Sequence, residues 1–245
     1  MESSVLENKV VVITGASRGL GAGMAEEMAK RGVRLGLCSR NPPALSSSET
    51  VVAESVDVTD EAALATFADK VAAKLGPIDL WINNAGILDP IDQLRNAKSE
   101  DFRRHLDINV LGVFHGSKIY ANHVRSRDGG GVLVNISSGA ARSPYSGWSA
   151  YCAGKSAVDR MTEVLAIEEE DAGLVCYSVA PGIIDTDMQE LIRSVTADRF
   201  PLVEKFRQLK ADAAFTTADK VGAAILELAF EPSAARDRVS IDLRE

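Results

Sequence analysis

The sequence predicts an α/β fold, a single doubly wound domain spanning residues 1–245 with a mostly parallel seven-stranded sheet and helices on both faces. Short, fully apolar runs alternate with longer segments of helical periodicity, a pattern typical of parallel strands buried on both sides. The length of 245 residues fits one such domain, and 46% hydrophobic with 25% charged residues is an ordinary globular composition. Such folds bind ligands beyond the carboxyl ends of the strands, so the residues that follow each strand are the candidates for function.

The expected elements follow one another in a regular order. The strands are expected at 9–14, 33–38, 51–56, 78–83, 132–136, 174–180 and about 238–243. The helices are expected at roughly 18–31, 60–75, 99–127, 148–172 and 218–230. The helix over 60–75 is the clearest, because its apolar residues recur at helical spacing, Thr59 or Asp60 can cap its start, and Gly76-Pro77 ends it. The segment of about 183–212 mixes apolar and charged residues, so it is expected to form either a helical lid over the substrate or a surface hairpin.

Charge and composition argue against several classes of function. A net charge of −8 disfavours a nucleic-acid partner. No apolar run approaches the ~18 residues of a membrane-spanning helix, and the first residues lack the pattern of a secretory signal. The cysteines, Cys38, Cys152 and Cys176, form no CxxC pair and have no metal-ligand spacing with the histidines. We therefore expect a reduced cytoplasmic protein without a bound metal.

A glycine-rich turn directly follows the first expected strand and reads Thr14-Gly15-Ala16-Ser17-Arg18-Gly19-Leu20-Gly21. Glycines permit a tight turn and let backbone amides approach a pyrophosphate, and the N–H groups that open the following helix attract the same anion. A glycine cluster alone is weak evidence. Its place between a buried strand and a helix favours a nucleotide site over an ordinary turn.

The end of the second strand indicates which dinucleotide binds. NAD-binding proteins normally place an acidic residue there to hold the ribose 2′-hydroxyl, whereas this chain has Ser39-Arg40. Arg40, with Arg18 as a second contact, can pair with a 2′-phosphate, so NADP(H) is the expected cofactor. The alternative is that both arginines are solvated surface groups.

Two further strand ends fit a nucleotide site. Asp57, in Val56-Asp57-Val58, can accept the adenine amino group, and Gly86, in Asn83-Asn84-Ala85-Gly86, permits close approach of the backbone while the asparagines brace neighbouring loops. Each of these features is also common turn chemistry.

A tyrosine and a lysine form the candidate reactive group. Tyr151 and Lys155 are spaced i, i+4 at the start of an expected helix, so they lie on the same face. Ser137 and Ser138 follow the strand 132–136, at the sheet edge where ligands bind. A nearby ammonium is expected to lower the pKa of the phenol, which then exchanges a proton with a carbonyl or alcohol oxygen while a serine hydroxyl stabilises the developing charge.

Taken together, these motifs make the sequence similar to the short-chain dehydrogenase/reductase family over nearly the whole chain, which implies a Rossmann-type fold. The motifs that carry the resemblance are TGASRGLG (14–21), NNAG (83–86), Asn109, NISS (135–138), YCAGK (151–155) and PG (181–182). In that family the catalytic serine lies thirteen residues before the tyrosine, which selects Ser138. The resemblance implies that Asn109 holds a water that returns protons to Lys155, and that Lys155 also grips the nicotinamide ribose.

The resemblance also implies which residues contact the cofactor. Pro181, Gly182 and Thr186 are expected to pack against the nicotinamide and its carboxamide. The full expected set comprises Gly15, Ser17, Arg18, Gly19, Leu20, Gly21, Ser39, Arg40, Asp57, Val58, Asn83, Ala85, Gly86, Ile136, Tyr151, Lys155, Pro181, Gly182, Ile184, Thr186 and Met188.

Within the family the chain resembles sepiapterin reductases and bacterial benzil reductases, through Gly147-Trp148 before the tyrosine and through the run 180–189. Sepiapterin reductases anchor the pterin with an aspartate in the last strand. Here Ser240 stands at that position, and Asp242, two residues on and on the same face of the strand, is a conceivable substitute. Tyr145 and Trp148 line an aromatic substrate pocket or pack the loop, and Ser138 and Gly182 complete the expected substrate site.

The resulting expectation is an NADPH-dependent carbonyl reductase for ketones or diketones. A 3-oxoacyl reductase or a sugar or alcohol dehydrogenase of the same family, and a non-catalytic NADP-sensing protein, are the alternatives. The helices over 99–127 and 148–172 are expected to form the interface of a homodimer or homotetramer. His105, His115 and His123 are expected at the surface or at that interface.

Overall fold

The computed structural model describes residues 6–212, 215–231 and 238–244. Within these residues a seven-stranded sheet has the order β3-β2-β1-β4-β5-β6-β7, and all neighbouring strands pair in parallel. The strands are β1 (Val10–Thr14), β2 (Arg34–Ser39), β3 (Val51–Ser55), β4 (Leu80–Asn83), β5 (Gly131–Ile136), β6 (Leu174–Ala180) and β7 (Ser240–Asp242). The strand order reverses between β1 and β4, so their carboxyl ends lie at the switch point where open α/β sheets bind ligands. The expected fold class is confirmed.

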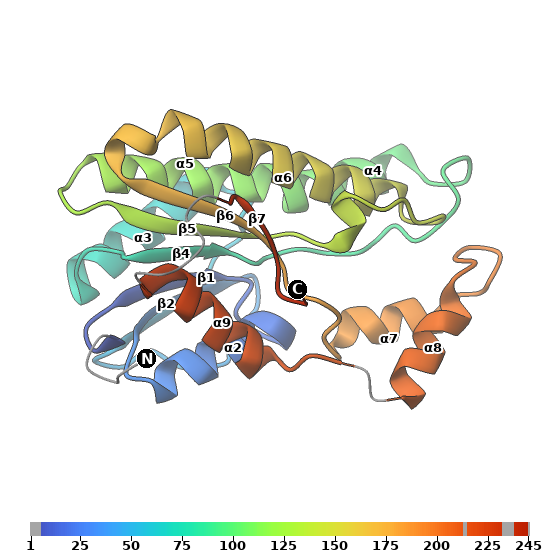
Figure 1. Cartoon of the computed structure of the whole chain (residues 1–245), viewed down its shortest axis with the longest axis horizontal. Coiled ribbons are helices and arrows are strands. Elements are labelled where there is room, and N and C mark those ends of the chain that lie inside the picture. The colour runs from blue at the N-terminus through green and yellow to red at the C-terminus, as the bar shows by residue number, and fades with distance from the viewer. Residues whose placement is uncertain (1–5, 213–214, 232–237, 245) are drawn as a thin grey trace.

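Helices cover both faces of the sheet (Figure 1). One layer holds α2 (Gly19–Lys30) and α9 (Ala218–Phe230), and the other holds α3 (Glu61–Leu75), α4 (Ser99–Leu106), α5 (Gly112–Arg125) and α6 (Ser149–Glu168). Successive residues of β1 serve the two layers in turn: Val11 and Ile13 pack with α2 and α9, whereas Val10 and Val12 pack with α3 and α5. This two-sided burial explains why the strand is apolar at each position from Val10 to Ile13.

The helix expected over 99–127 is interrupted. A π-helical turn, Asp107–Leu111, separates α4 from α5. Asn109 lies in this turn, and its side chain is bonded at both ends to the backbone of Ile87, with Nδ2 donating to the carbonyl at 2.8 Å and Oδ1 accepting from the amide at 2.9 Å. A π-helical turn holds one more residue than an α-helical turn. The periodicity of the sequence did not show this additional residue, because the apolar pattern continues on both sides of the turn.

The remaining boundaries lie within four residues of those expected, and those of β6 and α9 coincide with them. Asp60 is the cap of α3, since its carboxylate accepts from the amide of Ala63 at 3.0 Å. The helix expected over 148–172 ends at Glu168 and is followed by a short 3-10 turn that Gly173 closes with a φ of +72°. Among the residues described, no helix has both the length and the apolar character needed to cross a membrane.

The prediction that the histidines lie at the surface or at a subunit interface is wrong for two of them, which are buried within the chain itself. His105 is 0% exposed and His115 is 6% exposed. Each donates from Nδ1 to a backbone carbonyl, that of Asp89 at 2.7 Å and that of Val58 at 2.9 Å. Loops as well as neighbouring helices pack against α4 and α5. They therefore cover side chains that the sequence periodicity alone would place on the exposed face of these helices.

The segment of about 183–212 forms two short helices, α7 (Asp187–Ser194) and α8 (Val203–Ala211), which extend beyond the sheet in Figure 1. They pack on the start of α6 through a third, separate cluster of buried side chains. In it the rings of Trp148 and Phe200 are stacked, with centroids 4.7 Å apart and 5° between their planes. The expectation of amphipathic helices over this region is confirmed, while their movement as a lid remains a prediction.

Candidate active site

A cavity of about 330 Å³ runs along the carboxyl ends of the strands. It brings together the turn after β1, the ends of β2 to β6, the start of α6 and the start of α7. Nearly all of the residues expected to bind the cofactor or to react line it, namely Gly15, Ser17, Arg18, Gly19, Leu20, Gly21, Ser39, Arg40, Asp57, Val58, Ala85, Gly86, Asn109, Ile136, Ser138, Tyr151, Lys155, Pro181, Gly182, Ile184, Thr186 and Met188.

The glycine turn after β1 is closely packed against the loop after β4. A Cβ at Gly15, whose φ is +70°, would lie 2.7 Å from the Cα of Ala85, and one at Gly21 would lie 2.4 Å from the carbonyl oxygen of Gly15. Asn84 ties the two loops, because its Nδ2 donates to the Thr14 carbonyl at 2.9 Å and its amide donates to the Thr14 hydroxyl at 3.0 Å. The turn therefore exposes backbone to the cavity and leaves no room for larger residues.

The start of α2 is suited to an anion. Arg18 precedes the helix without a side-chain cap, and the first turn of α2 has no acidic residue. The N–H groups that open a helix have no partners within it, and the helix dipole makes this end positive. A diphosphate supplies the acceptors that these N–H groups lack, so the glycine turn and α2 fit the pyrophosphate of a dinucleotide.

The far end of the cavity carries the residues expected at the adenosine. Arg40 is exposed and lines the cavity, and the hydroxyl of Ser39 donates to the carbonyl of Asn41 at 2.6 Å. The carboxylate of Asp57 accepts from the amide and the hydroxyl of Thr59, at 3.0 and 2.9 Å, so it also stabilises the turn in which it lies. The residues that end β2 thus offer a cation, and no carboxylate stands among 39–41.

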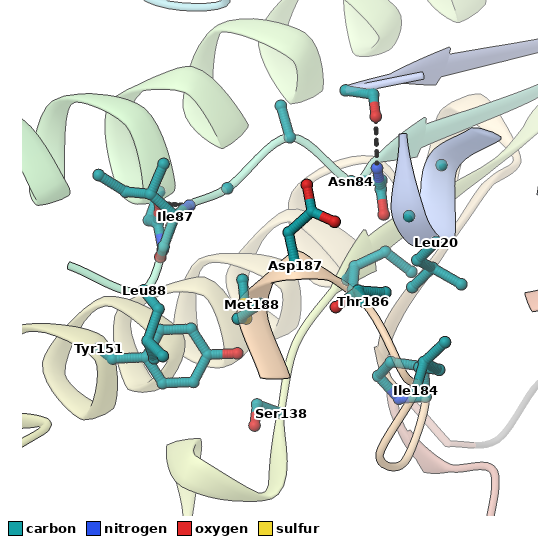
Figure 2. A pocket seen from close by; sticks show the side chains of 18 of the residues that line it. Leu20, Asn84, Ile87, Leu88, Ser138, Tyr151, Ile184, Thr186, Asp187 and Met188 are labelled. Atoms are coloured by element: carbon teal, nitrogen blue, oxygen red, sulfur yellow. Dashed lines mark hydrogen bonds between the residues drawn. The ribbon is translucent and has the colours of Figure 1, made fainter. Parts of the chain in front are cut away.

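Arg18 already has a partner within the protein. Its Nη1 lies 2.5 Å from the carboxylate of Asp187, the first residue of α7. Both side chains are largely exposed, so this ion pair adds little to stability, but it joins the glycine turn to the start of α7 across the cavity. Figure 2 shows Asp187 and Thr186 near Leu20 of the glycine turn. A 2′-phosphate would have to compete with Asp187 for this arginine.

Tyr151 and Lys155 lie together in the cavity, as their spacing predicts. The hydroxyl of Tyr151 points toward Ser138, which follows the carboxyl end of β5 (Figure 2). The ammonium of Lys155 lies 5.7 Å from the centroid of the Tyr151 ring and donates to the carbonyl of Ile136 at 2.7 Å. Three separate segments, β5, the turn after it and α6, therefore converge on one small volume.

The two reactive groups have shifted pKa values, and burial is the main cause in both. Burial raises the pKa of the Tyr151 phenol, and the hydrogen bond from Ser138 opposes the rise. Burial lowers the pKa of Lys155 to about 8, and the nearby carboxylate of Asp159 opposes the fall. The expectation of a phenol with a lowered pKa is thus wrong for the protein as it stands. Loss of solvation dominates, and Lys155 faces the tyrosine ring and a carbonyl.

The two serines after β5 have different roles. Ser138 lies near the hydroxyl of Tyr151 and accepts from the amide of Ala140 at 3.2 Å, whereas the hydroxyl of Ser137 donates to Asp159 at 2.5 Å. Asp159 lies one turn after Lys155 on α6 and also accepts from the hydroxyl of Ser178 in β6. This carboxylate was not predicted to matter. The i+4 spacing from Lys155 was the only signal in the sequence, and its two serine partners come from other segments.

Two residues of the expected site lie elsewhere. Asn83 does not line the cavity, because its side chain is 3% exposed and is bonded inside the sheet to Trp81, Asn135 and Ser117. The neighbouring Asn84 is the residue that reaches the cavity. A strand turns alternate side chains to opposite faces, and the order of the two asparagines in the sequence does not show which of them faces the ligand.

Asp242, the expected substitute for a pterin anchor, is also turned away from the cavity. Its side chain is 7% exposed and bonded to Arg244, with Nε to Oδ1 at 2.8 Å and Nη2 to Oδ2 at 2.5 Å. This pairing lowers the pKa of Asp242. Arg244 lines the cavity in its place, a role that the sequence did not reveal.

Tyr145 and Trp148 both line the cavity. They also pack on one another, with ring centroids 5.0 Å apart, and their contact with a substrate stays a prediction. Apolar side chains that were not predicted complete this end of the cavity, namely Leu88, Ile192 and Phe206. Leu88 and Met188 appear near Tyr151 in Figure 2.

Comparisons with known proteins agree with this geometry. The model of the short chain dehydrogenase family matches residues 9–196, and the chain belongs to this family of oxidoreductases. A benzil reductase ((S)-benzoin forming) of Bacillus subtilis (strain 168) is 32% identical over 229 residues, covering 90% of this chain and 93% of that protein. A benzil reductase ((S)-benzoin forming) of Bacillus cereus is 29% identical over 232 residues, with the same two coverages.

Solved structures show the same architecture. The KRED1-Pglu enzyme has a TM-score of 0.82 and 27% identity, covering 95% of this chain and 99% of that one. ElxO, solved with NADP bound, has a TM-score of 0.80 and 29% identity, covering 96% of this chain and 97% of that one. The expected family and its likeness to benzil reductases are confirmed.

Proposed function

We propose that the protein is an NADPH-dependent carbonyl reductase that converts ketones or diketones to alcohols. The observation that carries this proposal is the convergence of Ser138, Tyr151 and Lys155 in the cavity whose other end is the glycine turn. A bound nicotinamide supplies the hydride that the carbonyl carbon receives. The residues of this chain supply the proton and stabilise the negative charge that develops on the carbonyl oxygen and then on the phenolate.

Tyr151 serves as the general acid. Its raised pKa keeps the phenol protonated at neutral pH, so it has a proton to give to the carbonyl oxygen. Ser138 donates a hydrogen bond to the same oxygen while negative charge develops there. After the transfer the phenolate is stabilised by the ammonium of Lys155, which is still mostly protonated at pH 7 because its pKa is about 8. Solvent then returns the proton to Tyr151.

The preference for NADPH rests on the end of β2. Arg40 lines the cavity there, and no acidic residue is present at 39–41 to repel a 2′-phosphate. The NADP-bound state of ElxO supports the same cofactor. The substrate end supports aromatic ketones, because Tyr145, Trp148 and Phe206 line it, and the benzil reductases among the relatives support a diketone.

The surface supports assembly with further copies of the chain. Apolar side chains on α5 and α6 are exposed, among them Phe114 at 44% and Ile167 at 77%. We include a homodimer or homotetramer through these helices in the proposal, tested by light scattering after gel filtration. The cysteines, which are all free, support a reducing cytoplasm as the site of action.

The decisive experiment measures NADPH oxidation by the purified protein with aromatic diketones, pterins and acyl ketones, together with binding titrations of NADPH and NADH. Reduction of an aromatic diketone with NADPH is the expected result. Tight NADPH binding without turnover of any of these compounds would instead favour a sensing role, and tighter binding of NADH would contradict the cofactor assignment.

A further inference from the structure

Two of the residues that line the cavity carry a buried polar atom without a hydrogen-bond partner. They are Trp148, through its indole Nε1, and Gln189, through its amide oxygen Oε1. Trp148 is 5% exposed and Gln189 is 8% exposed, and neither atom is bonded to any residue that the structure describes. An unpaired buried polar group is costly, so a donor and an acceptor left open at a ligand cavity indicate a polar group on the ligand.

Trp148 lies beside the reacting group. It directly precedes α6, and its ring meets that of Tyr151 edge to face, with centroids 5.6 Å apart. The indole is held in this position by other aromatic rings, because it stacks on Phe200 at 4.7 Å and packs on Tyr145 at 5.0 Å between centroids. The open indole N–H and the phenol that gives the proton therefore belong to the same end of the cavity.

Gln189 comes to the same end from a different element, α7. The buried residues of this helix are Gln189 and Ile192, which are three positions apart on one face, and both line the cavity. Ile192 belongs to the cluster of buried side chains that contains Trp148. Met188, which directly precedes Gln189, appears near Tyr151 in Figure 2. The starts of α6 and α7 therefore bring the two unpaired groups to the part of the cavity where the chemistry is proposed.

The proposed chemistry uses neither of these groups. Ser138, Tyr151 and Lys155 perform the proton transfer, and the residues expected to contact the cofactor include neither Trp148 nor Gln189. Apolar side chains surround this end of the cavity and offer no hydrogen bonds, namely Leu88, Ile192 and Phe206. A partner for the indole N–H and the amide therefore comes from the substrate.

We propose that Trp148 and Gln189 bind a second oxygen of the substrate, on the carbon next to the reacting carbonyl, and so select vicinal diketones and α-hydroxy ketones over simple ketones. The proposal rests on the proposed reductase function and adds the residues that determine specificity. The indole N–H donates to either kind of oxygen. The Gln189 amide accepts from a hydroxyl through Oε1, and after a half turn its Nε2 donates to a carbonyl. A ketone without the second oxygen leaves both buried groups unpaired, which is how such a site rejects it.

The test compares benzil, benzoin and deoxybenzoin, which share one skeleton and carry a carbonyl, a hydroxyl or a plain CH₂ group at the second carbon. Gln189→Met keeps the length of the side chain and removes both hydrogen-bonding atoms. It should lower kcat/KM for benzil and benzoin about 5- to 50-fold more than for deoxybenzoin. The ratio of variant to wild type is taken for each ketone, so differences in intrinsic reactivity cancel. The affinity for NADPH, measured by fluorescence titration, checks that the variant is folded.

Two further variants separate the roles of the groups. Trp148→Phe keeps an aromatic ring and removes the N–H, so it should also cost more with benzil and benzoin than with deoxybenzoin. Gln189→Glu keeps an acceptor and loses the donor, so it should preserve more of the rate with benzoin than with benzil. Gln208→Met is the matched control, since Gln208 is an exposed glutamine of α8 that does not line the cavity. Equal losses with all three ketones in Gln189→Met and Trp148→Phe would overturn the proposal.

A binding measurement keeps the inference separate from the reductase function. If none of the ketones is reduced, the proposed function fails, and calorimetric titration of 1-phenylethane-1,2-diol and of 1-phenylethanol, with NADP present, decides the inference. The wild type should bind the diol about 5- to 50-fold more tightly than the monoalcohol, and Gln189→Met should remove most of this difference. Equal affinities of the wild type for the two alcohols would contradict the proposal.

Discussion

The two ends of the cavity are lined by different parts of the polypeptide, backbone at one end and side chains at the other. The cofactor end is made mostly of backbone, where Gly15 and Gly21 are packed so tightly that an added Cβ would lie within 2.7 Å of other atoms. The substrate end is made of side chains from distant segments, among them Trp148 of the α6 start, Phe206 of α8 and Arg244 after β7. The spacing of glycines in the sequence therefore predicts the cofactor end, whereas the shape of the substrate end depends on how separate helices and turns pack.

The reacting group lies between these ends and should show the largest effect. Tyr151→Phe should lower kcat for ketone reduction by roughly 10²–10⁴-fold, because the proton donor is lost while the ring and its packing remain. Steady-state kinetics with an aromatic diketone checks this, and the affinity for NADPH, measured by fluorescence titration, should change little. Turnover close to that of the wild type would contradict the mechanism.

A change at the adenosine end should affect the cofactor alone. Arg40→Gln should raise KM for NADPH about 10- to 100-fold, because a charge-assisted contact to the 2′-phosphate is lost, and should leave KM for NADH almost unchanged. Arg103→Gln, at an exposed arginine of α4 that does not line the cavity, is the control. An equal loss with both cofactors would show that Arg40 acts on something other than the phosphate.

The pH dependence of kcat tests the role of the Lys155 ammonium, which lies between the two ends of the cavity. Because the pKa of Lys155 is about 8 and the protonated form stabilises the phenolate, kcat for reduction should be full below pH 7 and fall as the pH rises through about 8. His105, which also faces Tyr151, has its pKa lowered by burial and stays neutral over this range.

A substitution of Asp159 makes the test of the pH dependence more specific. Its carboxylate raises the pKa of Lys155, so Asp159→Asn should move the fall in kcat to lower pH. The amide keeps an acceptor for the hydroxyls of Ser137 and Ser178, which preserves the tie between α6 and the strands. A profile that drops in height without moving along the pH axis would assign Asp159 a purely structural role.

The smallest effect is expected at the substrate end. Phe200→Leu removes the ring that stacks on Trp148 but keeps an apolar residue, so KM for an aromatic ketone should rise about 2- to 10-fold, in line with the worth of an aromatic pair. KM for NADPH should stay within experimental error. Leu202→Ala, at a partly exposed position two residues on, is the control. Equal changes in the two KM values would show that the ends are not independent.

Most of the fold and the reacting group could be predicted because their signals are local. Fully apolar strands, the cap at Asp60 and the glycine turn each occupy a few neighbouring residues, and Tyr151 and Lys155 share one helical turn. The π-helical turn at Asp107–Leu111 and the burial of His105 were not predicted, because both depend on what packs against α4 and α5. A periodic pattern indicates which side of a helix is apolar but not how many neighbours cover the other side.

The sequence by itself determined the parallel sheet and the glycine turn, and its spacing placed Tyr151 and Lys155 on one face of a helix. Ser138 was selected by the resemblance to the family. Only the tertiary structure decided that Asn84 rather than Asn83 faces the cavity, that Arg18 is paired with Asp187, and that Arg244 rather than Asp242 lines the cavity. The direction and the pairing of a charged side chain depend on segments distant in sequence, and burial, which sets the pKa values of Tyr151 and Lys155, exists only once those segments have come together.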